Sequence, residues 1–240
     1  MYLNLQPFGI QIYGKSLGDA WLSLVASILR HGEKDRDEKR DRIVLQNVRV
    51  KINKHNPEDK IIKKFGDKNN LKELLDMFFH NDKMKDFDVV PSFKCGTKSY
   101  HRRIKEGSMD KFIIKRLSLI PESKKAVMVF PTYEDYEAIL KNPWNDYLPC
   151  IVAIQFRLIK RKGKWVMNTI FFARSIDAFQ KSFANFVAIS KLAYIIKRRL
   201  KLKKKVEMGI IDGFITDAHI YKENIAKAKK LEKKLDKYIW

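Results

Sequence analysis

Apolar and polar positions alternate along several stretches of the chain, and this period of two residues predicts β-strands. The clearest case is a pair of alternating runs, 151–159 and 165–172, joined by a charged segment that contains Gly163. Two such runs around a glycine-containing turn predict a β-hairpin. The same alternation predicts further strands at 42–52, 126–130 and 209–216, and a strand or short hairpin within 1–16.

Other stretches repeat their apolar residues every three to four positions, which predicts helices. The first such helix covers 20–29, with Ser16 placed to cap its start. Further helices are predicted at 59–80, 109–119 and 179–200, and a lysine-rich helix at the end of the chain. The charged stretch 31–41 predicts an exposed loop, and 81–107 has the least regular pattern. The whole chain, 1–240, is therefore predicted to be one α+β domain in which helices pack on a mixed sheet.

Composition adds an excess of positive charge to this picture. The 240 residues include 50 Lys and Arg against 28 Asp and Glu, a net charge of +22. An apolar share of 45% with 12% aromatic residues is enough for a core, which excludes a disordered basic tail. A net positive charge attracts nucleic acids, phosphorylated small molecules and acidic proteins alike. It therefore does not identify a particular binding site or ligand.

The two cysteines, Cys95 and Cys150, are too few for a disulfide framework. No apolar run reaches the roughly 20 residues that a membrane span needs, and no signal sequence opens the chain. We therefore expect a soluble, cytoplasmic protein. Paired zinc-ligand spacings and glycine-rich phosphate loops are also absent from the sequence.

A set of chemically active side chains follows the predicted strands of the C-terminal half. A thiol precedes the hairpin, an Arg-Ser pair ends it, an amide lies in the next helix, and a His-x-Tyr pair follows the last predicted strand: Cys150, Arg174, Ser175, Asn185, His219 and Tyr221. Guanidinium and hydroxyl groups suit a phosphate, and an amide matches the N3–H and O4 edge of uracil. A thiol near cations can ionise and act as a nucleophile. Each residue taken alone is equally compatible with a structural role.

In this order the residues resemble the thymidylate synthase family and its hydroxymethyltransferase relatives, over most of the chain and closest to the short archaeal branch. The stretches that carry the resemblance are 148–150 with Gln155, 173–177, Asn185 and 217–221. The N-terminal half is similar at fewer positions: Arg42, Glu73, Tyr100, Lys124 and Lys125.

The resemblance implies a thymidylate synthase-like fold, a homodimer joined sheet to sheet, and two substrates. These are a pyrimidine nucleoside monophosphate and 5,10-methylenetetrahydrofolate. Cys150 would attack C6 of the pyrimidine, Glu73 would assist removal of the C5 proton, and Tyr100 would be the active-site tyrosine. The remaining implied roles are substrate contacts by Gln155 and Asn185; phosphate contacts by Arg42, Arg174 and Ser175, with Lys124 and Lys125 from the second subunit; sugar contacts by His219 and Tyr221; and a folate contact by Asp177.

Several positions depart from the family pattern. Ile151 stands where the family has His, Ala173 where Gln is common, Lys181 where it has Gly and Phe183 where Pro is common. The family's arginine pair is replaced by Lys124 and Lys125, and its folate-closing tail has no obvious counterpart after Tyr221.

The favoured function is folate-dependent conversion of dUMP to dTMP. One alternative is hydroxymethyl transfer to dUMP or dCMP. Another is a diverged member that binds nucleic acid through a basic face. The run 197–205, with seven basic residues in nine, is the candidate for that face, although cations are also expected at a helix C-terminus.

Overall fold

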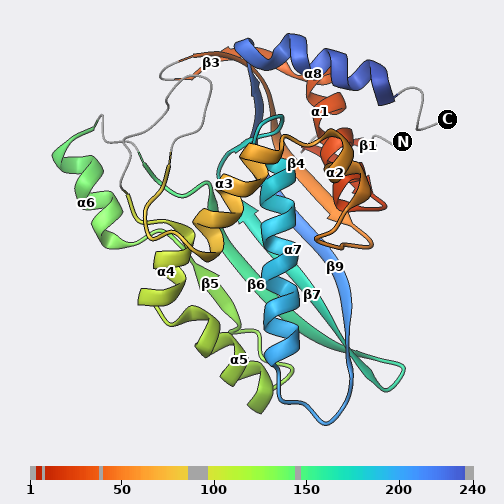
Figure 1. The fold of residues 1–240 in the computed structure, drawn as a ribbon, viewed down its shortest axis with the longest axis vertical. Coiled ribbons are helices and arrows are strands. Elements are labelled where there is room, and N and C mark those ends of the chain that lie inside the picture. The colour runs from red at the N-terminus through yellow and green to blue at the C-terminus, as the bar shows by residue number, and fades with distance from the viewer. Residues whose placement is uncertain (1–3, 7–8, 38–39, 86–96, 144–146, 236–240) are drawn as a thin grey trace.

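The computed structural model describes residues 4–6, 9–37, 40–85, 97–143 and 147–235. Its elements are arranged as one mixed sheet with a layer of helices (Figure 1). The strands are β1 (Asn4–Gln6), β2 (Gly9–Gly14), β3 (Glu33–Arg36), β4 (Asp41–Ile52), β5 (Val127–Val129), β6 (Ile151–Arg161), β7 (Lys164–Ala173), β8 (Ile176–Asp177) and β9 (Val206–Tyr221). The helices are α1 (Leu17–His31), α2 (Lys60–Phe65), α3 (Lys68–Phe79), α4 (Tyr100–Glu106), α5 (Met109–Leu119), α6 (Tyr133–Lys141), α7 (Ser182–Arg199) and α8 (Lys222–Leu235).

The strand order is β1-β2-β4-β9-β7-β6-β5, with β3 paired to β4 and β8 paired to β9. The pairs β2–β4, β7–β9 and β8–β9 are parallel, and the others are antiparallel. The predicted mixed sheet packed by helices is confirmed.

The predicted hairpin is formed by β6 and β7, which pair from Ile151↔Ala173 to Arg161↔Lys164. Its two turn residues, Lys162 and Gly163, have φ angles of 45° and 78°. Two consecutive positive φ angles are the geometry of a tight hairpin turn whose twist matches that of the strands. Glycine adopts this conformation easily, whereas lysine adopts it at an energetic cost.

Helix α7 lies across β6, β7 and β9 at the centre of the view in Figure 1. Most of its residues are buried, because the sheet lies on one side and helices α1, α3 and α5 contact it on others. Helix α1 packs on β2 and β4, and its Trp21 indole donates a 3.0 Å hydrogen bond to the carbonyl of Ala178. The core therefore lies between the sheet and this helix layer.

The opposite face of the sheet is partly exposed. Alternation leaves Phe172 of β7 and Phe214 of β9 exposed while their neighbours Phe171 and Ile215 are buried. The two exposed rings stack, with centroids 5.9 Å apart and planes 9° apart. Val129 of β5 is also exposed. This open face thus carries apolar side chains that no described helix covers.

A line of irregularities crosses four neighbouring strands. Asn47 of β4 has a φ of 55°, and β6 shifts register between Ile151 and Ala153. Between them, β7 ends at Ala173 and β8 resumes at Ile176, so Arg174 and Ser175 interrupt the pairing with β9. The hydroxyl of Thr216 on β9 donates a hydrogen bond to the Arg174 carbonyl at this break. Arg174 and Ser175 are therefore not part of the regular strand pairing, and both line the cleft described below.

Several local predictions need correction. The stretch 31–41 is not all loop, because 33–36 pairs with β4 as β3. The predicted helix 59–80 is two helices, since Gly66 ends α2 and the Asp67 side chain caps α3. The irregular stretch 81–107 contains α4, and α6 was not predicted at all. The last strand extends to residue 221, so His219 and Tyr221 lie within β9 and do not follow it.

Candidate active site

A cleft of about 720 Å³ opens where the central strands of the sheet end or begin. Strands β7 and β9 are parallel, and both have their C-terminal ends at the cleft. Strands β4 and β6 have their N-terminal ends there, because β4 is antiparallel to β9 and β6 is antiparallel to β7. Residues far apart in sequence therefore line one cavity. A volume of this size is in the range that binds small molecules and cofactors.

Cys150 lies in the cleft, directly before β6, and is half-buried. Its backbone carbonyl accepts a 2.9 Å hydrogen bond from the N–H of Arg174. The next N–H, that of Ile151, donates at 3.0 Å to the phenol oxygen of Tyr100. Both flanking contacts fix the backbone that carries the thiol. Cys150 is a free thiol, and Cys95 lies outside the described residues.

Tyr100 is held at the start of α4 by aromatic contacts. Its ring stacks on Phe78 at 4.2 Å and meets Phe130 edge-on at 4.9 Å. Burial, followed by the nearby Cys150 thiol, raises the pKa of the Tyr100 phenol well above its usual range. The phenol is therefore a neutral hydroxyl beside the thiol at physiological pH.

The Arg174 side chain hydrogen-bonds to the backbone of the segment that precedes Cys150. Its Nη2 donates to the carbonyl of Leu148 at 2.6 Å, and its Nε donates to that of Pro149 at 3.3 Å. The guanidinium has further N–H groups, and Nη1 makes no hydrogen bond to the residues that the structure describes. Arg174 can thus position the thiol segment and still bind an anion in the cleft.

The end of β9 supplies a polar cluster. The Nδ1 of His219 lies 2.7 Å from Oδ1 of Asp217 and 3.5 Å from the hydroxyl of Ser175. The ring of His219 meets that of Tyr221 at 4.6 Å. All four residues line the cleft and can offer hydrogen bonds to hydroxyl or phosphate oxygens.

Three arginines enter the cleft from β3, β4 and the connection between these strands. Arg42 lines it, but its guanidinium already binds Asp35 at 2.6 Å and Asp217 at 2.9 Å. Hydrogen bonding from Arg42 holds the pKa of the Asp35 carboxyl below its usual value. Arg36 and Arg40 also line the cleft, and the Arg40 guanidinium lies 3.6 Å from the centre of the Tyr221 ring. The sequence interpretation missed these two arginines because it assigned their stretch to an exposed loop.

Asn185 reaches the cleft from the first turn of α7 and is 4% exposed. Its side-chain amide makes no hydrogen bond to any residue of the described ranges, and its nitrogen and oxygen are not among the fully buried polar atoms, so both are accessible from the cleft. A ligand in the cleft that offers one donor and one acceptor can supply partners for both.

Glu73 lies on α3 beside the cleft and is not part of its lining. Its carboxylate pairs with the ammonium of Lys85, an Nζ–Oε2 distance of 3.1 Å, and Lys85 lines the cleft. Three other predicted site residues lie outside the cleft of this chain. Lys124 and Lys125 are exposed before β5, and Gln155 of β6 donates to the Lys124 carbonyl at 2.8 Å on the open face of the sheet.

Asp177 and Lys181 line the cleft where β8 leads into α7. Asp177 is 5% exposed, and its Oδ1 accepts hydrogen bonds from the N–H groups of Phe179 and Gln180, both at 3.0 Å. This carboxylate therefore shapes the turn that leads to Asn185.

The cleft combines a cationic part with an apolar part. Six basic and three acidic side chains line it, so the local charge favours an anionic ligand. The apolar part consists of Leu74, Met77, Met84, Ile139, Pro143 and Leu148. Such a cavity suits an anionic ligand that also carries flat or apolar rings, placed within reach of a thiol.

A comparison with known proteins gives a distant similarity. No protein-family model matches the chain. A protein of Methanothermobacter thermautotrophicus named "Putative thymidylate synthase" is 26% identical to this chain over 230 residues, which cover 90% of this chain and 96% of that protein. Among the described residues, no helix is long and apolar enough to cross a membrane.

Proposed function

We propose that this protein transfers a one-carbon unit to C5 of a uracil nucleotide, converting dUMP to dTMP through a covalent bond at Cys150. The observation that carries the proposal is the position of the Cys150 thiol in a cationic cleft, next to Arg174, Ser175 and the buried amide of Asn185. The similarity to a relative named as a thymidylate synthase along nearly its whole length supports the same class of enzyme.

The nucleotide is held by groups of matching chemistry. Arg174 and Ser175 bind the phosphate, and Arg42 contributes positive charge, although Asp35 and Asp217 already occupy its N–H groups. His219 and Tyr221 bond the sugar hydroxyl. The Asn185 amide pairs with the N3–H and O4 of uracil, which gives partners to a donor and an acceptor that have none among the described residues.

The chemistry begins with addition of the Cys150 sulfur to C6 of the uracil ring, which makes C5 nucleophilic. C5 would then form a bond to the one-carbon unit, and only after that bond has formed would C5 lose its proton. Glu73 would assist this proton loss through ordered water, because its carboxylate lies just outside the lining. Elimination of the Cys150 sulfur from C6 finally releases the product. The neutral phenol of Tyr100 fixes the Ile151 N–H and so holds the thiol segment in place.

The co-substrate of this reaction is 5,10-methylenetetrahydrofolate. The residues present fit it, since the apolar part of the cleft suits a pterin and Asp177 lies at the same cavity. When bound, the folate supplies the one-carbon unit and the hydride that reduces it to methyl. Lys181 and the other cations of the lining suit the acidic glutamate tail of a folate.

The active unit is a homodimer joined through the open face of the sheet. The exposed stacked pair Phe172 and Phe214 and the exposed Val129 form the apolar part of that face. Contiguous exposed apolar surface of this kind marks an interface. Lys124 and Lys125, which lie outside the cleft of their own chain, then contribute to the phosphate site of the partner.

Product analysis tests the proposal. The purified protein is incubated with methylenetetrahydrofolate and either dUMP, dCMP or UMP, and the products are weighed by mass spectrometry. We expect dTMP from dUMP. A hydroxymethyl nucleotide, or conversion of dCMP alone, would replace the proposal by the hydroxymethyltransferase alternative, and no product from any nucleotide would contradict it.

A further inference from the structure

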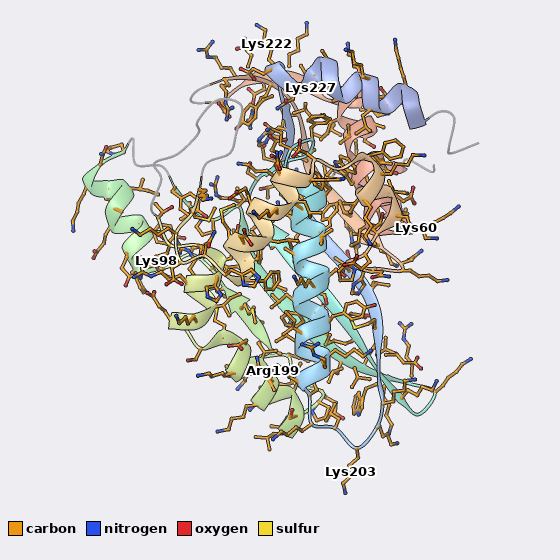
Figure 2. The ribbon with its side chains drawn as sticks, in the orientation of Figure 1. Lys60, Lys98, Arg199, Lys203, Lys222 and Lys227 are labelled. Atoms are coloured by element: carbon orange, nitrogen blue, oxygen red, sulfur yellow. The ribbon has the colours of Figure 1, made fainter. Side chains whose placement is uncertain are left out.

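A concentration of positive charge outside the cleft lies at the opposite end of the sheet. It comes from two segments: the tip of the β6–β7 hairpin and the connection from α7 to β9. In Figure 1 the connection forms the bottom of the view and the hairpin tip projects at the lower right, and in Figure 2 the label of Lys203 marks the bottom. The N–H of Trp165 bonds the carbonyl of Lys205 at 3.4 Å, which joins the two segments. We call this region the basic end, residues 160–164 and 197–205.

Most of its charge is not neutralised by the protein. Ten of its cations are exposed. Two of them are paired, Lys164 with Glu207 at 2.7 Å and Arg199 with Asp110 at 2.8 Å. The other eight form no ion pair with the residues described: Lys160, Arg161, Lys162, Arg198, Lys201 and the lysines of 203–205.

Local structure does not account for this charge. Cations in the last turn of α7 are favoured by the helix dipole, which explains at most Lys197, Arg198 and Arg199. The hairpin tip is not at a helix end. Lys162 even occupies a left-handed conformation, φ 45°, that Asn or Gly would adopt with less strain. The lysine at this position therefore weakens the turn while adding charge.

The basic end is also separate from the cleft. It lies at the start of β7, whereas Arg174 follows the end of β7, ten residue steps or roughly 30 Å away. Its cations cannot contact a nucleotide bound beside Cys150. They are therefore free to bind a different anionic ligand.

From these observations we infer that the basic end binds the phosphate backbone of a nucleic acid duplex without reading its sequence. A run of unneutralised cations on two adjoining segments matches closely spaced phosphates. No residue of the basic end is itself an exposed large apolar side chain. The exposed Leu119 and Tyr194 lie beside it, because the N–H of Lys201 bonds the Ser118 hydroxyl and Lys197 contacts the Tyr194 ring. Cations outnumber these two side chains, which favours a duplex backbone over the stacking that holds single strands or the apolar insertion that anchors membranes.

Binding of a fluorescent 20-base-pair DNA duplex, measured by anisotropy across a salt series, tests this inference. We expect a steep decrease in affinity with salt, a slope of log K against log salt of about −4, which corresponds to four or five neutralised phosphates. Two triple variants remove the charge: Lys160→Gln with Arg161→Gln and Lys162→Gln, and Lys203→Gln with Lys204→Gln and Lys205→Gln. Each is expected to weaken binding at least tenfold and to make the slope shallower.

A matched control removes the same charge elsewhere. Lys60→Gln, Lys227→Gln and Lys230→Gln change exposed residues on α2 and α8, and Figure 2 shows Lys60 and Lys227 far from Lys203. We expect less than a threefold change in affinity. The single variant Lys162→Asn keeps and favours the turn, and it should weaken binding while raising the melting temperature.

Four outcomes would overturn the inference. The first is no binding, or binding that does not respond to salt. The second is an equal loss in the control variant, because binding would then follow the net charge of the whole surface. The third is tighter binding to single-stranded DNA of the same length, and the fourth is a preference for phosphatidylserine vesicles over the duplex.

Discussion

The phenol oxygen of Tyr100 accepts a 3.0 Å hydrogen bond from the backbone N–H of Ile151, the residue that directly follows Cys150. This contact joins α4 to the start of β6 across 51 positions of sequence. It makes the position of the thiol depend on a side chain whose ring is fixed between Phe78 and Phe130.

Removing the Tyr100 hydroxyl is therefore expected to lower stability and disturb the thiol. Tyr100→Phe leaves the buried Ile151 N–H without its acceptor, which costs about 1–3 kcal/mol. Chemical unfolding measures the free energy, and the rate at which iodoacetamide labels the peptide that contains Cys150, separated from that of Cys95, reports on the thiol. The control is Tyr133→Phe, because Tyr133 is 90% exposed and the same atom is removed there. Equal stability of the two variants would contradict a positioning role for Tyr100.

Arg174 is expected to act through the shape of its guanidinium as well as its charge. Arg174→Lys keeps the cation but cannot bond the carbonyls of Leu148 and Pro149 while also binding a phosphate. We expect the KM for dUMP to increase tenfold or more, a loss of about 1.4 kcal/mol of binding energy. Steady-state kinetics measures this effect. An unchanged KM would show that Arg174 is structural alone.

The amide of Asn185 is expected to select uracil over cytosine. Asn185→Asp replaces the N–H donor with a carboxyl group, and that group must be protonated to match the edge of cytosine. We expect kcat/KM for dUMP to decrease at least tenfold, and the ratio of dCMP to dUMP turnover to increase. Competition between the two nucleotides in one reaction measures the ratio directly. No change in the ratio would place the selectivity in another residue.

Acid is expected to destabilise the protein through a histidine far from the thiol. Burial lowers the pKa of His55 to about 4, and its Nδ1 lies 2.9 Å from the Ser190 hydroxyl. In the unfolded chain the histidine is protonated below about pH 6.5, whereas in the folded chain it stays neutral down to about pH 4. The contribution of neutral His55 to the free energy of unfolding is therefore complete above pH 6.5 and is lost as the pH falls from 6.5 to 4. The loss is about 1.4 kcal/mol per pH unit at its steepest.

Chemical unfolding at several pH values measures that slope. His55→Gln should flatten it, whereas His80→Gln, at an exposed position, should leave it unchanged. An identical slope in His55→Gln and the unmodified protein would contradict the assignment.

Sequence patterning predicted the sheet and most helices because their periods reflect burial on one face. Strand β6 alternates, and its hairpin turn contains the glycine that its geometry requires. Strand β3 was missed because its four residues are all exposed, so it has no apolar face to reveal it. Helix α6 was missed for the same reason, since none of its residues is buried.

The candidate site was predictable in part. The order of Cys150, Arg174, Asn185 and His219 along the chain indicated one cavity, and the structure brings all four to it. The sequence could not show which of these side chains are already paired with other charged residues of the protein. Arg42 is held by two carboxylates, and Glu73 by Lys85. Such pairs depend on contacts between residues distant in sequence, which patterning does not report.

The most direct test of the central proposal is trapping of the Cys150 adduct. The protein is incubated with 5-fluoro-dUMP and methylenetetrahydrofolate, and its intact mass is measured, followed by mapping of the modified peptide. We predict a stable ternary adduct on the peptide that contains Cys150, and none in Cys150→Ser. The absence of an adduct in the unmodified protein with folate in excess, or an adduct that persists in Cys150→Ser, would contradict the account.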